Sequence, residues 1–317
     1  METSLKARMK KWLETTFREQ VAFDEPMARH TSLKVGGPAD AFVRVEDKKK
    51  LAELVHWAGH NHIHWLIVGG GTNLLISDSG IRGIVIVLTR EFEEITEKPA
   101  GGGAYCFRAG AGAKLQSLCR MAAEKGAQGM NFAIGIPGTV GGAIAMNAGT
   151  SLGSMKDVVE AVSFLLPDKT IVELKKDRLG FNYRSFSIAD DGFDNKDTPP
   201  VILEGCFHLT RGDKETIKKE AQKIRDARWQ HQPTALPNAG CFFKNPESGD
   251  TAGKLIELAG LKGIQVGGAK VSEKHANFMV NTGDASAKDF ILLMETVKKR
   301  VFDRFNIMLE PEVKIAG

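Results

Sequence analysis

Long apolar runs and paired cysteines are both missing from this sequence of 317 residues. The longest apolar stretches, such as Ile84 to Leu88, have the length of a strand, whereas a membrane-spanning helix needs about 20 apolar residues. The first residues lack the apolar centre of a signal peptide. Four cysteines lie far apart with no C-x-x-C pair: Cys106, Cys119, Cys206 and Cys241. These absences predict a cytoplasmic protein with reduced thiols and no membrane partner, although two distant thiols could still meet in the fold.

Charge of one sign is not in excess either. The 43 Lys and Arg residues nearly balance 39 Asp and Glu residues, leaving a formal net charge of +4. The basic residues between 211 and 228 alternate with acidic ones, which is typical of a solvated helix face. We therefore expect no nucleic-acid partner. A chain of this length has room for two or three domains.

The dinucleotide fingerprint G-x-G-x-x-G is absent as well. Counting from Gly69, the sixth position is Leu74, and counting from Gly110 it is Leu115. The motif requires glycine at this position, and neither candidate has it. A Rossmann site for nicotinamide is therefore not indicated.

A histidine cluster raises the question of a metal site: His56, His60, His62 and His64. The first two have the i, i+4 spacing of a helical zinc site, but there is no H-E-x-x-H motif and no carboxylate between them. We interpret the cluster as surface histidines at a helix–strand junction and predict no metal.

Helical and strand-like patterns alternate along the chain, which predicts an α+β fold. An amphipathic helix is expected at the start, with Leu5, Met9, Leu13 and Phe17 on one face. A break is expected near residue 211. Further helices are expected at 47–60, 114–125, 251–258 and from an N-cap at 286 to 305, and strands at 40–45, 64–68, 83–88, 105–109, 158–166, 170–174, 201–209 and 307–315.

Two glycine-rich loops are the first candidate binding segments. One is VGGGTN at 68–73, directly after a buried strand, and the other is GIPGTVGG at 135–142. Consecutive glycines allow backbone N–H groups to converge on an anion without interference from a Cβ atom. Either loop alone could equally be an ordinary tight turn.

Three further segments carry polar groups that are ambiguous one at a time. Arg184, in FNYRSFS, could be a stacked surface residue or an anion clamp, and Glu310 and Glu312, in LEPEVKIAG, could simply face solvent. Cys241, in AGCFFKNP, could fill a core, form a redox pair or transfer a proton.

Together and in this order, these five segments resemble the UDP-N-acetylenolpyruvoylglucosamine reductase (MurB) family. The resemblance runs from about residue 31 to residue 315. The five segments together are specific to this family, although each segment alone is not. The short spacing between 246 and 254 leaves no room for the tyrosine-bearing loop of one subclass. The chain is therefore similar to the shorter subclass.

The resemblance implies an FAD-binding fold of the vanillyl-alcohol-oxidase and p-cresol-methylhydroxylase (PCMH) type, followed by a C-terminal α+β substrate domain. It divides the chain into an FAD-binding subdomain at 1–92 with the N-terminal helix, a second one at 93–211, and a substrate-binding domain at 212–317. FAD is expected to be non-covalent, with NADPH as co-substrate. A cytoplasmic monomer is expected.

The implied reaction is the reduction of UDP-N-acetylglucosamine enolpyruvate to UDP-N-acetylmuramate. Arg184 would stabilise the enolate formed after hydride transfer, with Glu312 as the partner carboxylate. Many members have serine at the position of Cys241, which would donate the proton; a thiol with a pKa near 8.5 is mostly protonated at neutral pH. A buried packing cysteine is the alternative.

Other site residues are carried over from the resemblance. Those implied for FAD are Gly69, Gly70, Gly71, Thr72, Asn73, Pro137, Gly138, Gly141, Gly142 and Asn147. Those implied for substrate are Tyr183, Lys244, Asn245, Lys262 and His275. Two rival functions remain: a flavin oxidase of the same fold acting on another substrate, and a sugar-nucleotide binder that has lost its flavin.

Overall fold

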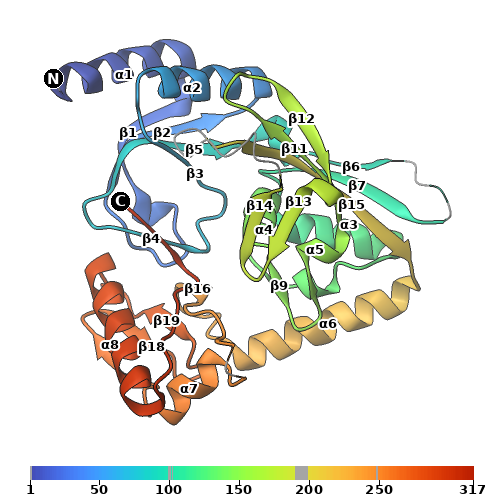
Figure 1. Ribbon diagram of the computed structural model, residues 1–317, viewed down its shortest axis with the longest axis vertical. Helices are drawn as coiled ribbons and strands as arrows, with labels where there is room; N and C mark the ends of the chain where they lie inside the picture. The colour runs from blue at the N-terminus through green and yellow to red at the C-terminus, as the bar shows by residue number, and fades with distance from the viewer. Residues whose placement is uncertain (1, 99–100, 102, 190–198, 248) are drawn as a thin grey trace. The chain divides into compact units, whose positions relative to one another are not determined.

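The structure is a computed structural model that describes residues 2–98, 101, 103–189, 199–247 and 249–317, with side chains described from residue 5 onward. The chain forms two compact units, each built from separate stretches of sequence (Figure 1). Unit 1 comprises Met1–Phe23, Ala41–Gly69 and Gly83–Asp226. Unit 2 comprises Asp24–Asp40, Gly70–Arg82 and Ala227–Gly317. The division into three domains stays a prediction.

The first part of unit 1 is a pair of helices against a small sheet. The helices are α1 (Glu2–Phe17) and α2 (Lys48–His60), and the sheet has the order β1 (Val21–Pro26), β2 (Pro38–Val45), β5 (Ile81–Leu88), β3 (Trp65–Ile67). Trp12 of α1 stacks on Trp57 of α2 with ring centroids 4.2 Å apart. Asp47 begins α2 by accepting a hydrogen bond from the Lys50 N–H. Figure 1 shows both helices at the blue end of the chain, as the sequence predicts.

A larger sheet forms the second part of unit 1. Its order is β12 (Ile171–Lys175), β11 (Val159–Leu165), β15 (Val201–Arg211), β7 (Tyr105–Gly110), β6 (Ile95–Lys98), and β8 (Ala127–Gln128) also pairs with β15. Three helices lie on one face of it: α3 (Leu115–Lys125), α4 (Val140–Ala145) and α5 (Met155–Val158) (Figure 1). Phe107 and Phe207 are fully buried in the core beneath these helices.

Short elements complete unit 1 around these two sheets. They are the pairs β9 (Gly149–Thr150) with β10 (Gly153–Ser154) and β13 (Leu179–Asn182) with β14 (Ser185–Ile188), and 3₁₀ turns at Arg18–Gln20, Arg90–Glu93, Asn131–Ala133 and Lys176–Arg178. The hairpin of β13 and β14 carries the predicted catalytic arginine at its turn.

Unit 2 packs two helices on an antiparallel sheet. The sheet has the order β16 (Asn238–Cys241), β19 (Phe278–Asn281), β18 (Ala269–Val271), β17 (Gln265–Val266), and the helices are α7 (Ala252–Leu258) and α8 (Ala287–Phe305). Ser286 and Asp289 close a reciprocal capping box at the start of α8, which confirms the predicted N-cap. β4 (Leu74–Ile76) pairs in parallel with β20 (Lys314–Ala316), and a 3₁₀ turn lies at Met27–Arg29. The helix α6 (Lys214–His231) contains the last of the points at which the chain passes from unit 1 to unit 2.

One predicted strand is wrong in its extent. A continuous strand over 307–315 is expected from the sequence, but β20 covers only Lys314–Ala316. Proline at 311 has no N–H to donate to a ladder. The backbone of Glu310 accepts from Lys244 and that of Glu312 donates to Phe242, so this stretch forms isolated contacts with the segment after β16.

Candidate functional site

The two predicted glycine loops meet in unit 1. Gly69 is exposed and follows the buried Val68. A Cβ atom at Gly69 would overlap the hydroxyl of Thr139 in the second loop. Glycine at 69 is therefore required by the contact between the loops, and their exposed backbones lie next to each other.

The second loop is fixed by its own backbone to the segment that follows β7 of the larger sheet. Gly141 donates its N–H to the Ala111 carbonyl at 2.9 Å, and a Cβ on Gly141 would lie 2.8 Å from that of Ala111. Thr139 caps α4 by accepting from the Gly142 N–H at 3.4 Å. Gly138 has φ +116°, which glycine tolerates without strain. Pro137 and Gly142 remain exposed on this fixed loop.

The rest of the first loop belongs to unit 2. Gly71 has φ +60°, and a Cβ there would overlap the carbonyl of His30, so no larger residue fits. Asn73 donates from Nδ2 to the carbonyl of Glu312 at 3.2 Å, and its own carbonyl accepts from the Lys314 N–H at 3.0 Å. The Asn73 amide, predicted for FAD, therefore holds the backbone of the predicted catalytic carboxylate.

Arg184 lies in the two-residue turn between β13 and β14. Its φ is +54°, and its guanidinium carbon lies 5.2 Å from the centre of the exposed Tyr183 ring. Asn147, only 6% exposed, donates from Nδ2 to the Asn182 carbonyl at 2.9 Å, and its Oδ1 accepts from the Lys156 N–H. Asn147, predicted to contact FAD, thus fixes the base of the hairpin that carries Arg184.

Cys241 ends strand β16 in unit 2, opposite Phe278 of β19. The register shifts just before it, where Gly240 has φ +78° and its N–H donates to Oδ1 of Asn238. Asn238 also donates from Nδ2 to the Pro233 and Leu236 carbonyls, at 3.1 and 2.8 Å. A bulge of this kind redirects a side chain at the end of a strand. The Cys241 thiol is half-buried at this point.

Asn277 fixes the residues that follow Cys241. Its Oδ1 accepts from the Phe243 N–H at 2.9 Å, and its Nδ2 donates to the Phe243 carbonyl at 2.8 Å. Its backbone carbonyl accepts from the Phe242 N–H at 2.8 Å. The side chain is 3% exposed, so in the protein interior its amide takes the place of a neighbouring strand as the hydrogen-bond partner of the Phe243 backbone. No sequence signal distinguishes Asn277, because its bonds join residues 34 positions apart.

Glu312 lies beside the Cys241 segment. Its N–H donates to the Phe242 carbonyl at 2.8 Å, and Phe243 and Pro311 form the neighbouring antiparallel bridge. Lys244 and Glu310 extend the contact with an ion pair at 3.2 Å. Two residues of the predicted catalytic set, Cys241 and Glu312, therefore occupy adjoining segments of one compact unit, although they are 71 positions apart in the sequence.

The remaining predicted substrate residues are also in unit 2, each with a protein partner. Oδ1 of Asn245 accepts from the Ala252 N–H at 3.1 Å, at the start of α7. Lys262 forms an ion pair with Glu257 at 2.7 Å. Nδ1 of His275 accepts from the Asn277 N–H at 3.2 Å, which leaves the proton of the neutral ring on Nε2.

Burial and charge favour a neutral His275. Burial lowers the pKa of His275 below its ordinary value, and the nearby Lys262 ammonium acts in the same direction. Burial also lowers the pKa of Arg228, while the charge of Cys241 acts on it in the opposite direction. Arg228, which the sequence reasoning missed, is thus a cation near Cys241 in unit 2.

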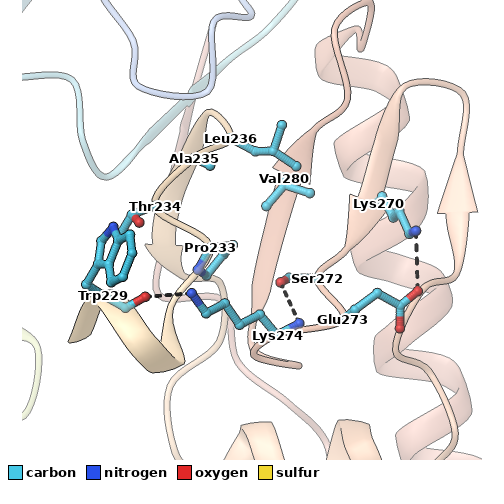
Figure 2. Close-up of a pocket in the computed structure, with 10 residues that line it drawn as sticks. All are labelled: Trp229, Pro233, Thr234, Ala235, Leu236, Lys270, Ser272, Glu273, Lys274 and Val280. Atoms are coloured by element: carbon cyan, nitrogen blue, oxygen red, sulfur yellow. Dashed lines mark hydrogen bonds and ion pairs between the residues drawn. The ribbon is translucent and has the colours of Figure 1, made fainter. Parts of the chain in front are cut away.

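A separate cavity of about 310 Å³ opens in unit 2 (Figure 2). Its walls include Trp229, Pro233 and Leu236, and Figure 2 shows Lys274 reaching the Trp229 carbonyl while Lys270 pairs with Glu273. None of the residues predicted for catalysis, FAD or substrate is among those that line it.

The predicted histidine cluster lies at the end of α2. His56 and His60 have ring centroids 4.0 Å apart, and Nδ1 of His60 lies 2.9 Å from the His56 carbonyl. Within the described ranges, no group of three or more His, Cys, Asp or Glu side chains is placed to hold a metal ion. No helix in the same ranges is long and apolar enough to span a membrane.

Comparisons with known proteins cover nearly the whole chain. The family model for the C-terminal domain of UDP-N-acetylenolpyruvoylglucosamine reductase matches residues 232–316, and that for an FAD binding domain matches residues 39–175. The enzyme named UDP-N-acetylenolpyruvoylglucosamine reductase from Desulfosudis oleivorans is 50% identical over 97% of this chain and 98% of its own. That from Lachnoclostridium phytofermentans is 40% identical over 94% of each.

A solved structure agrees with these sequence relatives. The crystal structure of UDP-N-acetylenolpyruvylglucosamine reductase (MurB) from Thermus caldophilus is 34% identical and superposes with a TM-score of 0.76. The match covers 94% of this chain and 98% of the other.

Proposed function

The chain belongs to the UDP-N-acetylenolpyruvoylglucosamine reductase family, and on that premise we propose how its own residues perform the reaction. The protein is an NADPH-dependent, FAD-containing oxidoreductase. It reduces UDP-N-acetylglucosamine enolpyruvate to UDP-N-acetylmuramate in peptidoglycan precursor synthesis. The observation that carries this function is 50% identity over 97% of the chain to a reductase of that name. The predicted fold, a PCMH-type FAD-binding part with a C-terminal substrate domain, is confirmed by the two domain matches.

The residues present in the two glycine loops fit FAD. Gly69, Gly70 and Gly142 present exposed backbone without side chains, and the contact of Gly69 with Thr139 brings the two loops together. Exposed N–H groups on adjacent glycine loops suit a pyrophosphate. We place Gly71, Thr72, Pro137, Gly138 and Gly141 along the same cofactor. When bound, FAD supplies hydride transfer. Asn73 and Asn147 would support this site through the protein contacts described above, since their amides are already engaged.

Arg184 is assigned to the negative charge that develops on the substrate. Addition of hydride to the terminal vinyl carbon leaves charge delocalised into the carboxylate, which a fixed planar cation stabilises. The turn between β13 and β14 gives Arg184 a defined backbone, and Asn147 fixes the base of that hairpin. Glu312 is assigned as the partner carboxylate of the same step.

Cys241 is assigned as the proton donor. A half-buried thiol at the end of a strand, at a bulge fixed by Asn238 and Asn277, is positioned as a general acid has to be. Core filling is the weaker interpretation, because the neighbouring Phe242 and Phe243 are fully buried whereas Cys241 is not.

The substrate contacts are assigned to Tyr183, Lys244, Asn245, Lys262 and His275. The neutral His275 would present its Nε2–H as a hydrogen-bond donor, and Lys262 would supply positive charge toward the diphosphate. We further propose that FAD is non-covalent, that the protein is a cytoplasmic monomer, and that 1–92, 93–211 and 212–317 act as two FAD-binding subdomains and a substrate domain.

Two measurements test this function. Purified protein should be yellow, and it should oxidise NADPH only when UDP-N-acetylglucosamine enolpyruvate is present. A colourless protein would indicate the sugar-nucleotide binder. NADPH oxidation that continues without that substrate would favour the oxidase, which the match of the C-terminal domain disfavours.

Cys241→Ala tests the assignment of the proton donor. Turnover should fall by about 10²–10⁴-fold, the usual contribution of a positioned general acid. Reduction of FAD by NADPH should be nearly unchanged, because that step needs no proton from this side chain. Cys241→Ser should retain activity. An alanine variant that turns over like the parent would refute the assignment without affecting the family function.

A further inference from the structure

Two cysteines that lie 100 positions apart in the sequence meet in unit 1. Cys106 of β7 stands opposite His208 of β15, and Cys206 of β15 stands opposite Arg108 of β7. The two cysteines are therefore diagonal neighbours on adjacent antiparallel strands. Their Sγ atoms are 3.3 Å apart. Both are thiols in the structure.

The pair lies on the face of the sheet that does not carry the helices. Side chains alternate between faces along a strand, and the alternate residues Phe107 and Phe207 are buried in the core beneath α3 and α4. On the opposite face, Arg108 forms ion pairs of 2.6 Å with Glu173 and Glu204. Cys106 is half-buried on this polar face, whereas Cys206 is 9% exposed.

We propose that Cys106 and Cys206 form an oxidisable thiol pair, which a low-molecular-weight disulfide converts reversibly to a cross-strand disulfide. The thiolate of Cys106 attacks one sulfur of the small disulfide, which breaks its S–S bond and releases one small thiol. Cys206 then attacks Sγ of Cys106 and releases the second small thiol. Two protein thiols are oxidised, one disulfide is reduced, and their two protons pass to the small thiols.

Burial sets the order of the two steps. It raises the pKa of Cys206 to about 12, and the thiolate is the attacking form, so Cys206 is the poorer nucleophile toward a reagent from solvent. Cys106 is the more exposed of the two and reacts first. The second step occurs between groups already in contact, which compensates for the low thiolate fraction of Cys206. The charge of Arg108 acts on the Cys206 pKa in the favourable, lowering direction.

The diagonal placement predicts that the bond is easily reversed. Diagonal neighbours in a sheet have Cα atoms about 7–8 Å apart, wider than the usual 4.4–6.8 Å of a disulfide. Closure therefore requires a small shift of β7 relative to β15. Disulfides formed under such constraint have more oxidising potentials and are the labile ones, which suits a modification that forms under oxidation and reopens in a reducing compartment.

Peptide mapping of the oxidised protein tests the proposal. FAD-loaded protein is incubated with oxidised glutathione, its remaining thiols are alkylated, and the digest is analysed by mass spectrometry. We expect one peptide that joins the segments containing Cys106 and Cys206, lost on reduction. Cys206→Ser should instead accumulate glutathione on Cys106. The control Cys119→Ser should form the same link as the parent, because Cys119 is buried and contacts the Met130 carbonyl elsewhere in unit 1.

Either of two results would overturn the proposal. One is a parent protein in which Cys106 and Cys206 both remain open to alkylation, or carry only glutathione, while other cysteines react. The other is a Cys106–Cys206 link that forms only after unfolding in urea. The map of the parent decides the question by itself if Cys206→Ser fails to fold.

Discussion

Replacing Asn277 with leucine tests how the Cys241 segment is held. The substitution keeps a similar volume but removes the amide that accepts from the Phe243 N–H and donates to the Phe243 carbonyl. Both backbone groups would then be buried without a partner. Each such loss costs about 1–3 kcal/mol, so the free energy of unfolding should fall by about 2–6 kcal/mol. Equilibrium urea unfolding followed by circular dichroism measures this change.

The same variant should also lose turnover, for a reason separate from stability. The backbone of Phe242 and Phe243 continues directly from Cys241 and bonds to Glu312, so a relaxed segment displaces two groups of the site. A displacement near 1 Å can cost roughly 10²-fold in rate. We expect kcat to fall under conditions where the variant is fully folded, with the rate of FAD reduction by NADPH unchanged.

Asn281→Leu is the matched control. Asn281 is 4% exposed, donates from Nδ2 to the Leu33 carbonyl, and accepts from Gly283 and Ala285 N–H groups, none of which adjoins Cys241. Its loss should destabilise the protein comparably while leaving kcat near the parent value. The reasoning fails if Asn277→Leu loses less than about 0.5 kcal/mol, the range of ordinary surface substitutions. It also fails if the two variants lose kcat equally.

Three further outcomes are expected. Arg184→Lys should keep FAD but lose most turnover, because an ammonium lacks the planar fork suited to a delocalised enolate; equal losses in turnover and in FAD reduction by NADPH would argue against this role. Lys262→Met should raise the pKa of His275 toward its ordinary value near 6.5, though not fully, since burial is the larger cause of its lowering. An NMR titration of the histidine ring measures this, and an unchanged pKa would contradict it. Acid precipitation should release all flavin, whereas colour retained on the precipitate would show a covalent bond.

Local signals in the sequence predicted the main elements well. Ser286 caps the helix α8, which buries the stripe that includes Phe290, Leu293 and Val297. Both features could be predicted because a cap and a period of 3.6 residues are local properties of the sequence. The position of Arg184 at a hairpin turn and of Cys241 at a strand end was not predicted from the sequence. Their roles were implied by the family resemblance, and hydrophobic periodicity gives no information about such roles.

The supporting asparagines could not be predicted, because their partners are remote in sequence. Asn73 holds the backbone of Glu312 across 239 positions, and Asn277 holds Phe243 across 34. The sequence does not distinguish an asparagine that contacts a ligand from one that stabilises a turn beside a glycine loop. The expected strand over 307–315 is shorter for a different reason, because Pro311 has no N–H to donate and the neighbouring backbone bonds to the segment after β16.

The pairing of β4 with β20 has a consequence for the order in which the protein is made. Leu74–Ile76 leaves the ribosome long before Lys314–Ala316, so β4 cannot pair with its parallel partner until all the residues between them have been translated. Domains generally fold from the N-terminus during synthesis at about 5–20 residues per second. The nascent chain therefore spends on the order of 10 s or more with the Asn73 segment unpaired. Deletion of residues 314–317 would remove the strand that pairs with β4, so it should destabilise the part of unit 2 in which Asn73 bonds to Glu312.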